Sequence, residues 1–237
     1  MIGSFFRWIG LISVMGYYVI AGLVRSPFGT AGSYYRRVAG RFGRQMLAVA
    51  GGKATWEGLD NLDPEKCYVF VGNHQSYVDI FLLFASLESR KMRTLFMVKR
   101  ELFKIPLFGP MAKRMGLIPI EREESRKALK TILNAVDTLE KGYSLTIFPE
   151  GTRTKDRKIQ PFKRGAFVIA GHTKMSIVPF AIIGTADIMP SSNMSVRPGP
   201  CHISFLPPIT HVDISGKELA STVENAVINE YNRLILA

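Results

Sequence analysis

The chain has 237 residues, of which 47% are apolar, and its mean hydropathy is +0.11. This length suits one domain with a substantial core and a small appendage, while the composition is too polar for a protein with many membrane spans. The net charge of +12 predicts an anionic partner, which is nucleic acid, a membrane surface or a phosphorylated substrate.

The N-terminal segment predicts a membrane anchor. Residues 8–24 carry no charge, and with Phe5 and Phe6 the apolar run approaches 20 residues, about the length of a helix that crosses a bilayer. A signal peptide has a shorter apolar core followed by a small-residue cleavage site. We therefore expect a retained anchor, although a buried core hairpin remains the alternative.

The next segment, residues 33–50, predicts a helix at the membrane surface. Its aromatic and aliphatic residues fall near helical spacing, and Arg36, Arg37, Arg41 and Arg44 largely occupy the remaining positions. Because positive flanks belong on the cytoplasmic side, we expect residues 1–50 to anchor the protein in the cell inner membrane. The catalytic domain would then lie on the cytoplasmic face. A single span and a re-entrant pair of helices both fit this pattern.

The remainder of the chain predicts one α/β domain over residues 51–237, with a mixed, largely parallel central sheet flanked by helices. Short apolar runs alternate with helical patterns, as in sheets that are covered on both faces. The predicted strands are 67–72, 94–98, 117–120, 144–149, 176–183 and 201–207. The predicted helices are 79–87, 107–115, 123–141, 163–171 and 216–235, and residues 185–200 are expected to form a loop.

The two cysteines, Cys67 and Cys201, lie far apart and belong to no C-x-x-C pair. A zinc ribbon or a thioredoxin-like site therefore has no support, and we predict no metal site. We expect two buried, reduced thiols, which is compatible with a cytosolic face.

The segment Asn73-His74-Gln75-Ser76-Tyr77-Val78-Asp79 follows the first predicted strand and is the first candidate for chemistry. If His74 lies in the turn and Asp79 in the first helical turn, the carboxylate reaches the imidazole and fixes its tautomer for proton abstraction. The alternative is structural, because Ser76-x-x-Asp79 also has the form of a helix capping box.

The segment Phe148-Pro149-Glu150-Gly151-Thr152-Arg153 follows another predicted strand. Gly151 permits close backbone approach, and Thr152 and Arg153 offer donors to a phosphate. An ordinary solvated basic loop is the alternative interpretation.

Two further cations, Lys99 and Arg122, come just after predicted strands. Cations repeated at strand ends predict a phosphate site next to the His74/Asp79 pair. Pro179 interrupts an apolar strand, which indicates a sheet edge, a bulge or a close ligand.

Together these segments resemble the glycerophospholipid acyltransferase family, in particular its 1-acyl-sn-glycerol-3-phosphate (lysophosphatidate) acyltransferases. The resemblance covers roughly residues 50–210, with five motifs in register. These are similar to the family's N-H-x-S-x-x-D and F-P-E-G-T-R blocks, its K-R-E-L block at Lys99, its glycine-to-arginine block ending at Arg122, and its proline block at Pro179.

The resemblance implies that His74, oriented by Asp79, removes a proton from a lysolipid hydroxyl, which attacks the thioester of acyl-CoA or acyl-carrier protein directly. It also implies that Lys99, Arg122 and Arg153 hold the acceptor phosphate and that Glu150, Gly151 and Thr152 shape the acceptor site. Asn73, Ser76 and Pro179 would be structural or acyl-site residues. No cofactor is implied beyond the acyl thioester as co-substrate. Membrane phospholipid and lysophosphatidate are the implied partners.

Other functions are less well supported by the sequence. Glycerol 3-phosphate or another lysolipid could serve as acceptor for the same chemistry. Gly142-Tyr143-Ser144 misses the G-x-S-x-G pattern of a serine esterase, and Ser144 begins a strand instead of following one. No recognised motif indicates nucleic-acid binding. A non-catalytic membrane-binding protein would not need such complete motifs.

Overall fold

The computed structural model describes residues 2–25, 31–106, 108–115, 117–120, 143–154, 156–163, 167, 175–210 and 216–236. Within these ranges the strands form one sheet in the order β1-β7-β6-β2-β5-β3-β4. Only the β6–β7 pair is antiparallel among the recorded pairings, so the predicted mixed, largely parallel sheet is confirmed. The strands are β1 (Gly52–Glu57), β2 (Val69–Gly72), β3 (Thr94–Lys99), β4 (Ile118–Ile120), β5 (Ser144–Ile147), β6 (Ile177–Ile183) and β7 (Gly199–Phe205).

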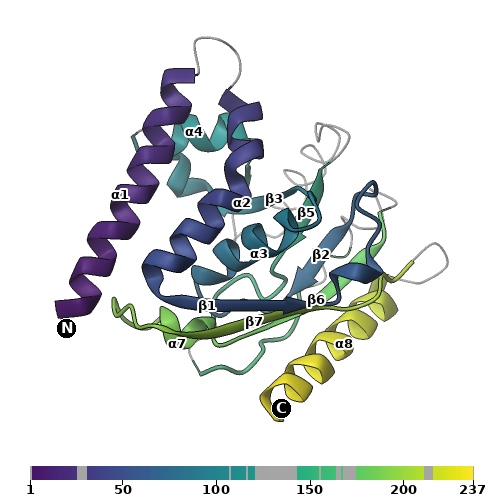
Figure 1. Ribbon diagram of the computed structural model, residues 1–237. Coiled ribbons are helices and arrows are strands. Elements are labelled where there is room, and N and C mark those ends of the chain that lie inside the picture. The colour runs from purple at the N-terminus through teal and green to yellow at the C-terminus, as the bar shows by residue number, and fades with distance from the viewer. Residues whose placement is uncertain are drawn as a thin grey trace.

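Helices cover both faces of the sheet (Figure 1). On one face lie α1 (Ile2–Arg25), α2 (Ala31–Ala50), α3 (Val78–Glu88) and α4 (Phe108–Met115), and on the other lies α8 (Gly216–Leu236). Three short elements connect these parts: η2 (Leu59–Asn61), η3 (Arg100–Lys104) and α7 (Thr185–Ile188).

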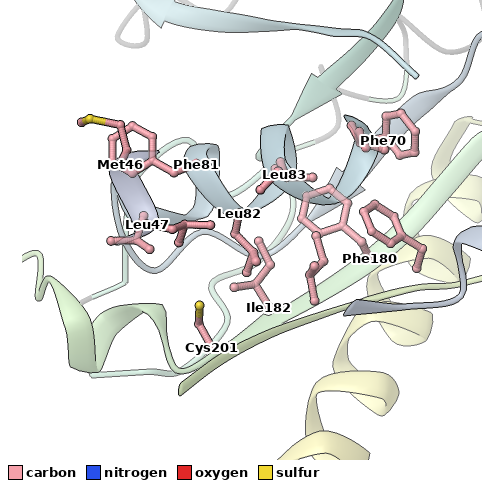
Figure 2. Packing of buried hydrophobic residues seen from close by; sticks show 14 of the residues in the cluster. Met46, Leu47, Phe70, Phe81, Leu82, Leu83, Phe180, Ile182 and Cys201 are labelled. Atoms are coloured by element: carbon pink, nitrogen blue, oxygen red, sulfur yellow. The ribbon is translucent and has the colours of Figure 1, made fainter. Parts of the chain in front are cut away.

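The continuous apolar runs of the inner strands follow from this layering, because successive side chains of a strand point to opposite faces. In β2, Phe70 belongs to the core cluster under α2 and α3, whereas Val69 and Val71 belong to the cluster under α8. Figure 2 shows the larger cluster, in which α3 residues such as Leu82 pack against Ile182 of β6.

All six predicted strands are present, as are the predicted helices at α3, α4 and α8. Strand β1 was not predicted, since Gly52–Glu57 is largely exposed and has no apolar run. Part of the predicted loop 185–200 forms α7 and the beginning of β7. The predicted helix 123–141 lies outside the described residues, and so does most of 163–171.

The interpretation of Pro179 as an edge or bulge residue is wrong. β6 lies between β7 and β2, and Pro179 is buried opposite Val71. The Pro179 carbonyl accepts a hydrogen bond from the Leu206 amide (2.9 Å), just beyond the last pair of the β6–β7 ladder. The missing proline N–H therefore lies beyond the last recorded pair of that ladder and interrupts none of its pairs.

The two N-terminal helices pack on the domain. Met46, Leu47 and Ala50 of α2 and Leu11 of α1 belong to the larger core cluster. At the N-terminal end of α1, the Trp8 indole N–H donates to the Met194 carbonyl (2.7 Å). The helix α1 is long and apolar enough to cross a membrane by length and composition.

Both cysteines are free thiols, but only Cys201 is buried, while Cys67 is half-buried. Burial raises the pKa of the Cys201 thiol to about 12, and the nearby Asp79 carboxylate adds to this effect. Cys201 packs in the core (Figure 2). This is the environment of an unreactive structural cysteine.

Substituting Leu82→Ala tests the packing of α3 between α2 and the sheet. Leu82 is fully buried, so the truncation should lower the free energy of unfolding by about 2–5 kcal/mol. Chemical denaturation in detergent measures this, and Leu236→Ala, at a side chain that is 87% exposed, is the matched control. Equal losses in both variants would contradict the described core.

Candidate active site

The candidate residues gather at one edge of the sheet because their strands are parallel. β2 pairs with β5, and β5 pairs with β3, both in parallel, so the carboxyl ends of these strands lie along the same edge. His74 follows β2, Glu150 follows β5, and Lys99 ends β3. In open α/β sheets this edge is where ligands bind.

The structure brings His74 and Asp79 into contact. His74 Nδ1 lies 2.8 Å from Asp79 Oδ2, and both side chains are buried, at 8% and 0% exposure. His74 lies in the turn before α3 and Asp79 in the first turn of that helix, which lets residues five apart in sequence meet. Since a carboxylate only accepts hydrogen bonds, Nδ1 carries a proton, and in the neutral form of the imidazole Nε2 therefore has the lone pair.

Asp79 also organises the backbone of the same turn. Its Oδ2 accepts hydrogen bonds from the amides of Gln75 (2.7 Å) and Ser76 (2.9 Å) in addition to the imidazole. The bond to Ser76 resembles the backward contact of a capping box, so Asp79 has the structural role that its spacing from Ser76 predicts, whereas its catalytic role stays a prediction. One oxygen therefore sets the shape of the loop and the orientation of the imidazole.

One face of the His74 imidazole is covered by the ring of Phe148. This residue begins the segment Phe148–Arg153, the second motif, and His74 belongs to the first motif, Asn73–Asp79. The His74 and Phe148 rings are stacked, with centroids 4.0 Å apart and an angle of 16° between their planes. Phe148 in turn lies against Phe96 and Phe180. This stack and the Asp79 bond together restrain both rotatable bonds of His74.

Asn73 and Ser76 tie the loop to the neighbouring backbone. The buried Asn73 amide donates to the Ile182 carbonyl (2.9 Å), and its oxygen accepts from the Ile182 amide (2.7 Å). The Ser76 hydroxyl donates to the Met189 carbonyl (2.7 Å) and accepts from the Val78 amide (3.1 Å). Both motif residues therefore hold the loop and leave the imidazole edge clear.

Glu150 braces the loop from the other side. Its Oε1 accepts from the His74 backbone amide (2.6 Å) and its Oε2 from the Gln160 amide (2.8 Å). Burial, opposed by these two hydrogen bonds and assisted by the Asp79 charge, raises the pKa of Glu150 to about 7. Backbone donors thus bind both oxygens of Glu150, and one of these donors is the amide of His74.

The turn after Glu150 requires a glycine. Gly151 has φ of +71°, and a Cβ atom there would come within 3.0 Å of the Lys163 ammonium. The turn is followed by Thr152, which is exposed, and by Arg153, which is half-buried. The Arg153 guanidinium carbon lies 3.7 Å from the centre of the Tyr77 ring, so the second motif reaches back to the first.

The other predicted cations are not shown in contact with this centre. Lys99 lies at the same sheet edge two strands from His74, and its ammonium is 3.8 Å from Glu101 Oε2. Arg122 lies outside the described residues.

Several supporting residues were missed by sequence reasoning. Gln75 donates to the hydroxyl of Tyr231 (2.8 Å), which donates to the Arg157 carbonyl (2.8 Å), so α8 joins the two motif loops. The contacts of Phe148 and Tyr77 were also missed, although both lie inside the motifs. No spacing rule reveals which ring covers which group, because these contacts depend on the fold.

An apolar cavity of about 560 Å³ adjoins the site. It lies among α1, α2, α3 and β3, and its lining includes Leu11, Phe42, Tyr77 and Phe96. The Tyr77 ring contacts the Arg153 guanidinium. The Phe96 ring stacks with Phe148, and the Phe148 ring stacks with the His74 imidazole. The cavity therefore reaches the neighbourhood of the imidazole and of the guanidinium. Its size falls in the range of small-molecule sites.

The family model described as Acyltransferase matches residues 53–183, which is more than half of the chain. The chain belongs to the acyltransferase family. Both the His74/Asp79 loop and the Glu150–Arg153 turn fall within the part that matches this acyltransferase model.

Relatives within the acyltransferase family cover most of the chain. A 1-acyl-sn-glycerol-3-phosphate acyltransferase of Chlamydomonas reinhardtii is 36% identical over 218 residues, which is 88% of this chain and 64% of that protein. The chloroplastic LPAT1 of Arabidopsis thaliana, which has the same activity in its name, is 33% identical over 82% of this chain and 54% of that protein. The chain thus spans less than two thirds of the length of these relatives.

A solved structure shows the same acyltransferase fold. The crystal structure of PlsC from Thermotoga maritima, a 1-acyl-sn-glycerophosphate acyltransferase, matches with a TM-score of 0.81 at 23% identity. The match covers 100% of this chain and 96% of that one, so the N-terminal helices are part of the shared architecture.

The raised pKa of Glu150 makes stability depend on pH. The pKa of Glu150 is about 7 in the folded state and 4.5 in its ordinary state, so the folded protein holds the Glu150 proton more tightly than the unfolded chain does. The contribution of protonated Glu150 to the free energy of unfolding is therefore complete below pH 4.5 and is lost as the pH rises through 7. The unfolding free energy of the wild type should therefore fall, relative to that of Glu150→Gln, over this interval. Chemical denaturation at a series of pH values measures the difference, and Glu65→Gln, at an exposed glutamate, gives the background. A difference that does not vary with pH would refute this role.

Proposed function

We propose that the protein transfers an acyl chain from an acyl thioester to the sn-2 hydroxyl of 1-acyl-sn-glycerol 3-phosphate, giving phosphatidic acid in phospholipid synthesis. The observation that carries the proposal is the buried His74/Asp79 pair, which lies close to Arg153 and to an apolar cavity. The names of the relatives support the choice of substrate.

In this proposal His74 is the general base. Its Nε2 removes the proton from the acceptor hydroxyl while Asp79 stabilises the imidazolium that forms. The hydroxyl oxygen attacks the thioester carbonyl, the carbon–sulfur bond breaks, and the imidazolium returns the proton to the departing thiolate. The acyl thioester, acyl-CoA or acyl-carrier protein, is a co-substrate, and these steps ask for no metal or prosthetic group.

The cations of the site suit the phosphate of the acceptor, and the apolar cavity suits an acyl chain. The guanidinium of Arg153 matches the acceptor phosphate, and we assign Lys99 and Arg122 to the same anion. The apolar cavity suits an acyl chain, because burial of each methylene there contributes about 0.8 kcal/mol. Acylation of glycerol 3-phosphate or of another lysolipid is the second candidate, since the same base would serve those acceptors.

A serine-esterase mechanism is disfavoured by the surroundings of Ser144. This residue begins β5, is 2% exposed, and its hydroxyl accepts a hydrogen bond from the Tyr68 amide (3.0 Å). A nucleophile elbow instead places its serine after a strand and exposes the hydroxyl.

We further propose that α1 attaches the protein to the cytoplasmic face of the inner membrane. One face of α1 packs on the domain, and the opposite face exposes apolar side chains from end to end: Ile2, Phe5, Phe6, Ile9, Ile12, Tyr17, Ile20 and Val24. Trp8 near one end of the helix contacts the Met194 carbonyl of the domain, and Tyr18 towards the other end contacts Phe42 of α2, which itself packs on the domain. A helix held along its length in this way favours lying in the membrane interface over crossing it.

Replacing His74 tests the mechanism. His74→Ala should lower turnover of lysophosphatidate with an acyl thioester by roughly 10²–10⁴-fold while the far-UV circular dichroism stays unchanged. The matched control is His202→Ala, because His202 lies in β7, where its Nδ1 contacts Thr55 and not a motif residue. Turnover of purified His74→Ala at the wild-type rate would end the proposal. A panel of phosphorylated and neutral acceptors, read by lipid mass spectrometry, separates the two candidate acceptors.

Replacing Phe6, Ile9 and Ile12 with Gln tests the membrane face. The three side chains are 46–65% exposed, so the fold should persist while the protein loses affinity for vesicles of phosphatidylethanolamine and phosphatidylglycerol. Co-sedimentation measures the bound fraction. A double change of the exposed α8 residues Ile235 and Leu236 to Gln is the control and should not alter it. Undiminished sedimentation of the α1 variant would show that another surface binds lipid.

A further inference from the structure

Tyr77 occupies an unassigned position inside the first motif, between Ser76 and Asp79. Its side chain is 50% exposed, which is unusual in a segment whose neighbours are buried. The guanidinium carbon of Arg153 lies 3.7 Å from its ring centre, well within the distance of a cation–π contact. An exposed aromatic ring is therefore held against the cation of the second motif.

Among the described residues, the Tyr77 ring is the one recorded partner of the Arg153 guanidinium. The ion pairs recorded within these ranges join Arg153 to no carboxylate. A contact with a ring neutralises no charge and takes up no carboxylate, so the guanidinium keeps its N–H donors for an anion. Arginine is thus restrained without loss of its charge.

Tyr77 also belongs to the wall of the apolar cavity. The Tyr77 ring therefore contacts both the apolar cavity, which suits an acyl chain, and the Arg153 guanidinium, which suits a phosphate. Ile80 and Phe81 of α3 belong to the same apolar wall.

We propose that Tyr77 is a positioning residue that aims Arg153 at the acceptor phosphate and separates that phosphate from the acyl-chain cavity. This inference rests on the proposed function. It assigns to Tyr77 the discrimination between a phosphorylated lysolipid and one without phosphate. The residue acts through Arg153 and takes no part in proton transfer.

A change at this position should not unfold the protein. Tyr77 stands at the N-cap of α3 but makes no side-chain capping hydrogen bond, and half of its surface is already in solvent. Tyr77→Phe keeps the ring and removes the hydroxyl, whereas Tyr77→Leu removes the ring and keeps an apolar wall.

The experiment measures binding without turnover. Full-length His74→Ala protein in detergent micelles is titrated with 1-acyl-sn-glycerol 3-phosphate and, separately, with the corresponding monoacylglycerol, by isothermal titration calorimetry. Tyr77→Leu in this background should weaken binding of the phosphorylated lipid by roughly 3- to 30-fold, the effect of a lost cation–π contact, and leave monoacylglycerol binding unchanged. Tyr77→Phe should bind both lipids as the parent does.

A double-mutant cycle tests whether the effect passes through Arg153. In an Arg153→Ala background, Tyr77→Leu should cause no further loss of affinity for the phosphorylated lipid. Phe84→Leu, which changes another aromatic residue of the cavity, should weaken the two lipids equally.

The possible failures are distinguishable. Absence of lysophosphatidate binding by the parent protein would overturn the proposed function and this inference with it. Normal binding by the parent, combined with unchanged binding by Tyr77→Leu, equal losses for the two lipids or additive losses in the cycle, would overturn the role of Tyr77 alone.

Discussion

The site depends on one oxygen atom, Oδ2 of Asp79, which receives three hydrogen bonds from within five residues of chain. Two come from backbone amides and shape the turn, and the third orients the imidazole. The carboxylate is fully buried, so water does not compete for these donors. The orientation of the imidazole and the shape of its loop are therefore consequences of the same carboxylate.

The second motif supports the first through contacts that need the tertiary fold. The Glu150 carboxylate holds the His74 amide, the His74 carbonyl accepts from the Thr154 amide (2.9 Å), and Phe148 covers the imidazole face. These bonds join two loops that are more than 70 residues apart in sequence, and they do so because β2 and β5 are neighbours in the sheet. Parallel pairing thus converts two separate sequence blocks into one rigid constellation.

The sequence predicts the components of this site better than their connections. His74, Asp79 and the sheet edge follow from local pattern, because strand ends and residues five apart are properties of neighbouring chain. The contacts of Glu150 illustrate the limit, since nothing in the local sequence indicates that its two oxygens accept from the His74 and Gln160 amides. Pro179 illustrates another, because whether a strand is interior or at an edge depends on pairing that no single strand encodes. Strand β1 was missed for a related reason: its pairing with β7 compensates for a weak apolar pattern.

The packing of α1 and α2 on the domain makes these two helices part of the folded core of this chain. Leu11, Met46 and Leu47 lie in the same core cluster as α3, the helix that carries Asp79. In addition, the loop that accepts the Trp8 hydrogen bond at Met194 contains Ser191, whose hydroxyl donates to the Thr154 carbonyl (2.8 Å). If α1 and α2 were replaced by the N-terminal helices of a distant relative, the new side chains would have to pack against α3 and against the loop at Met194. A change in the packing face of α1 or α2 is therefore also a change in the support of the helix that holds Asp79.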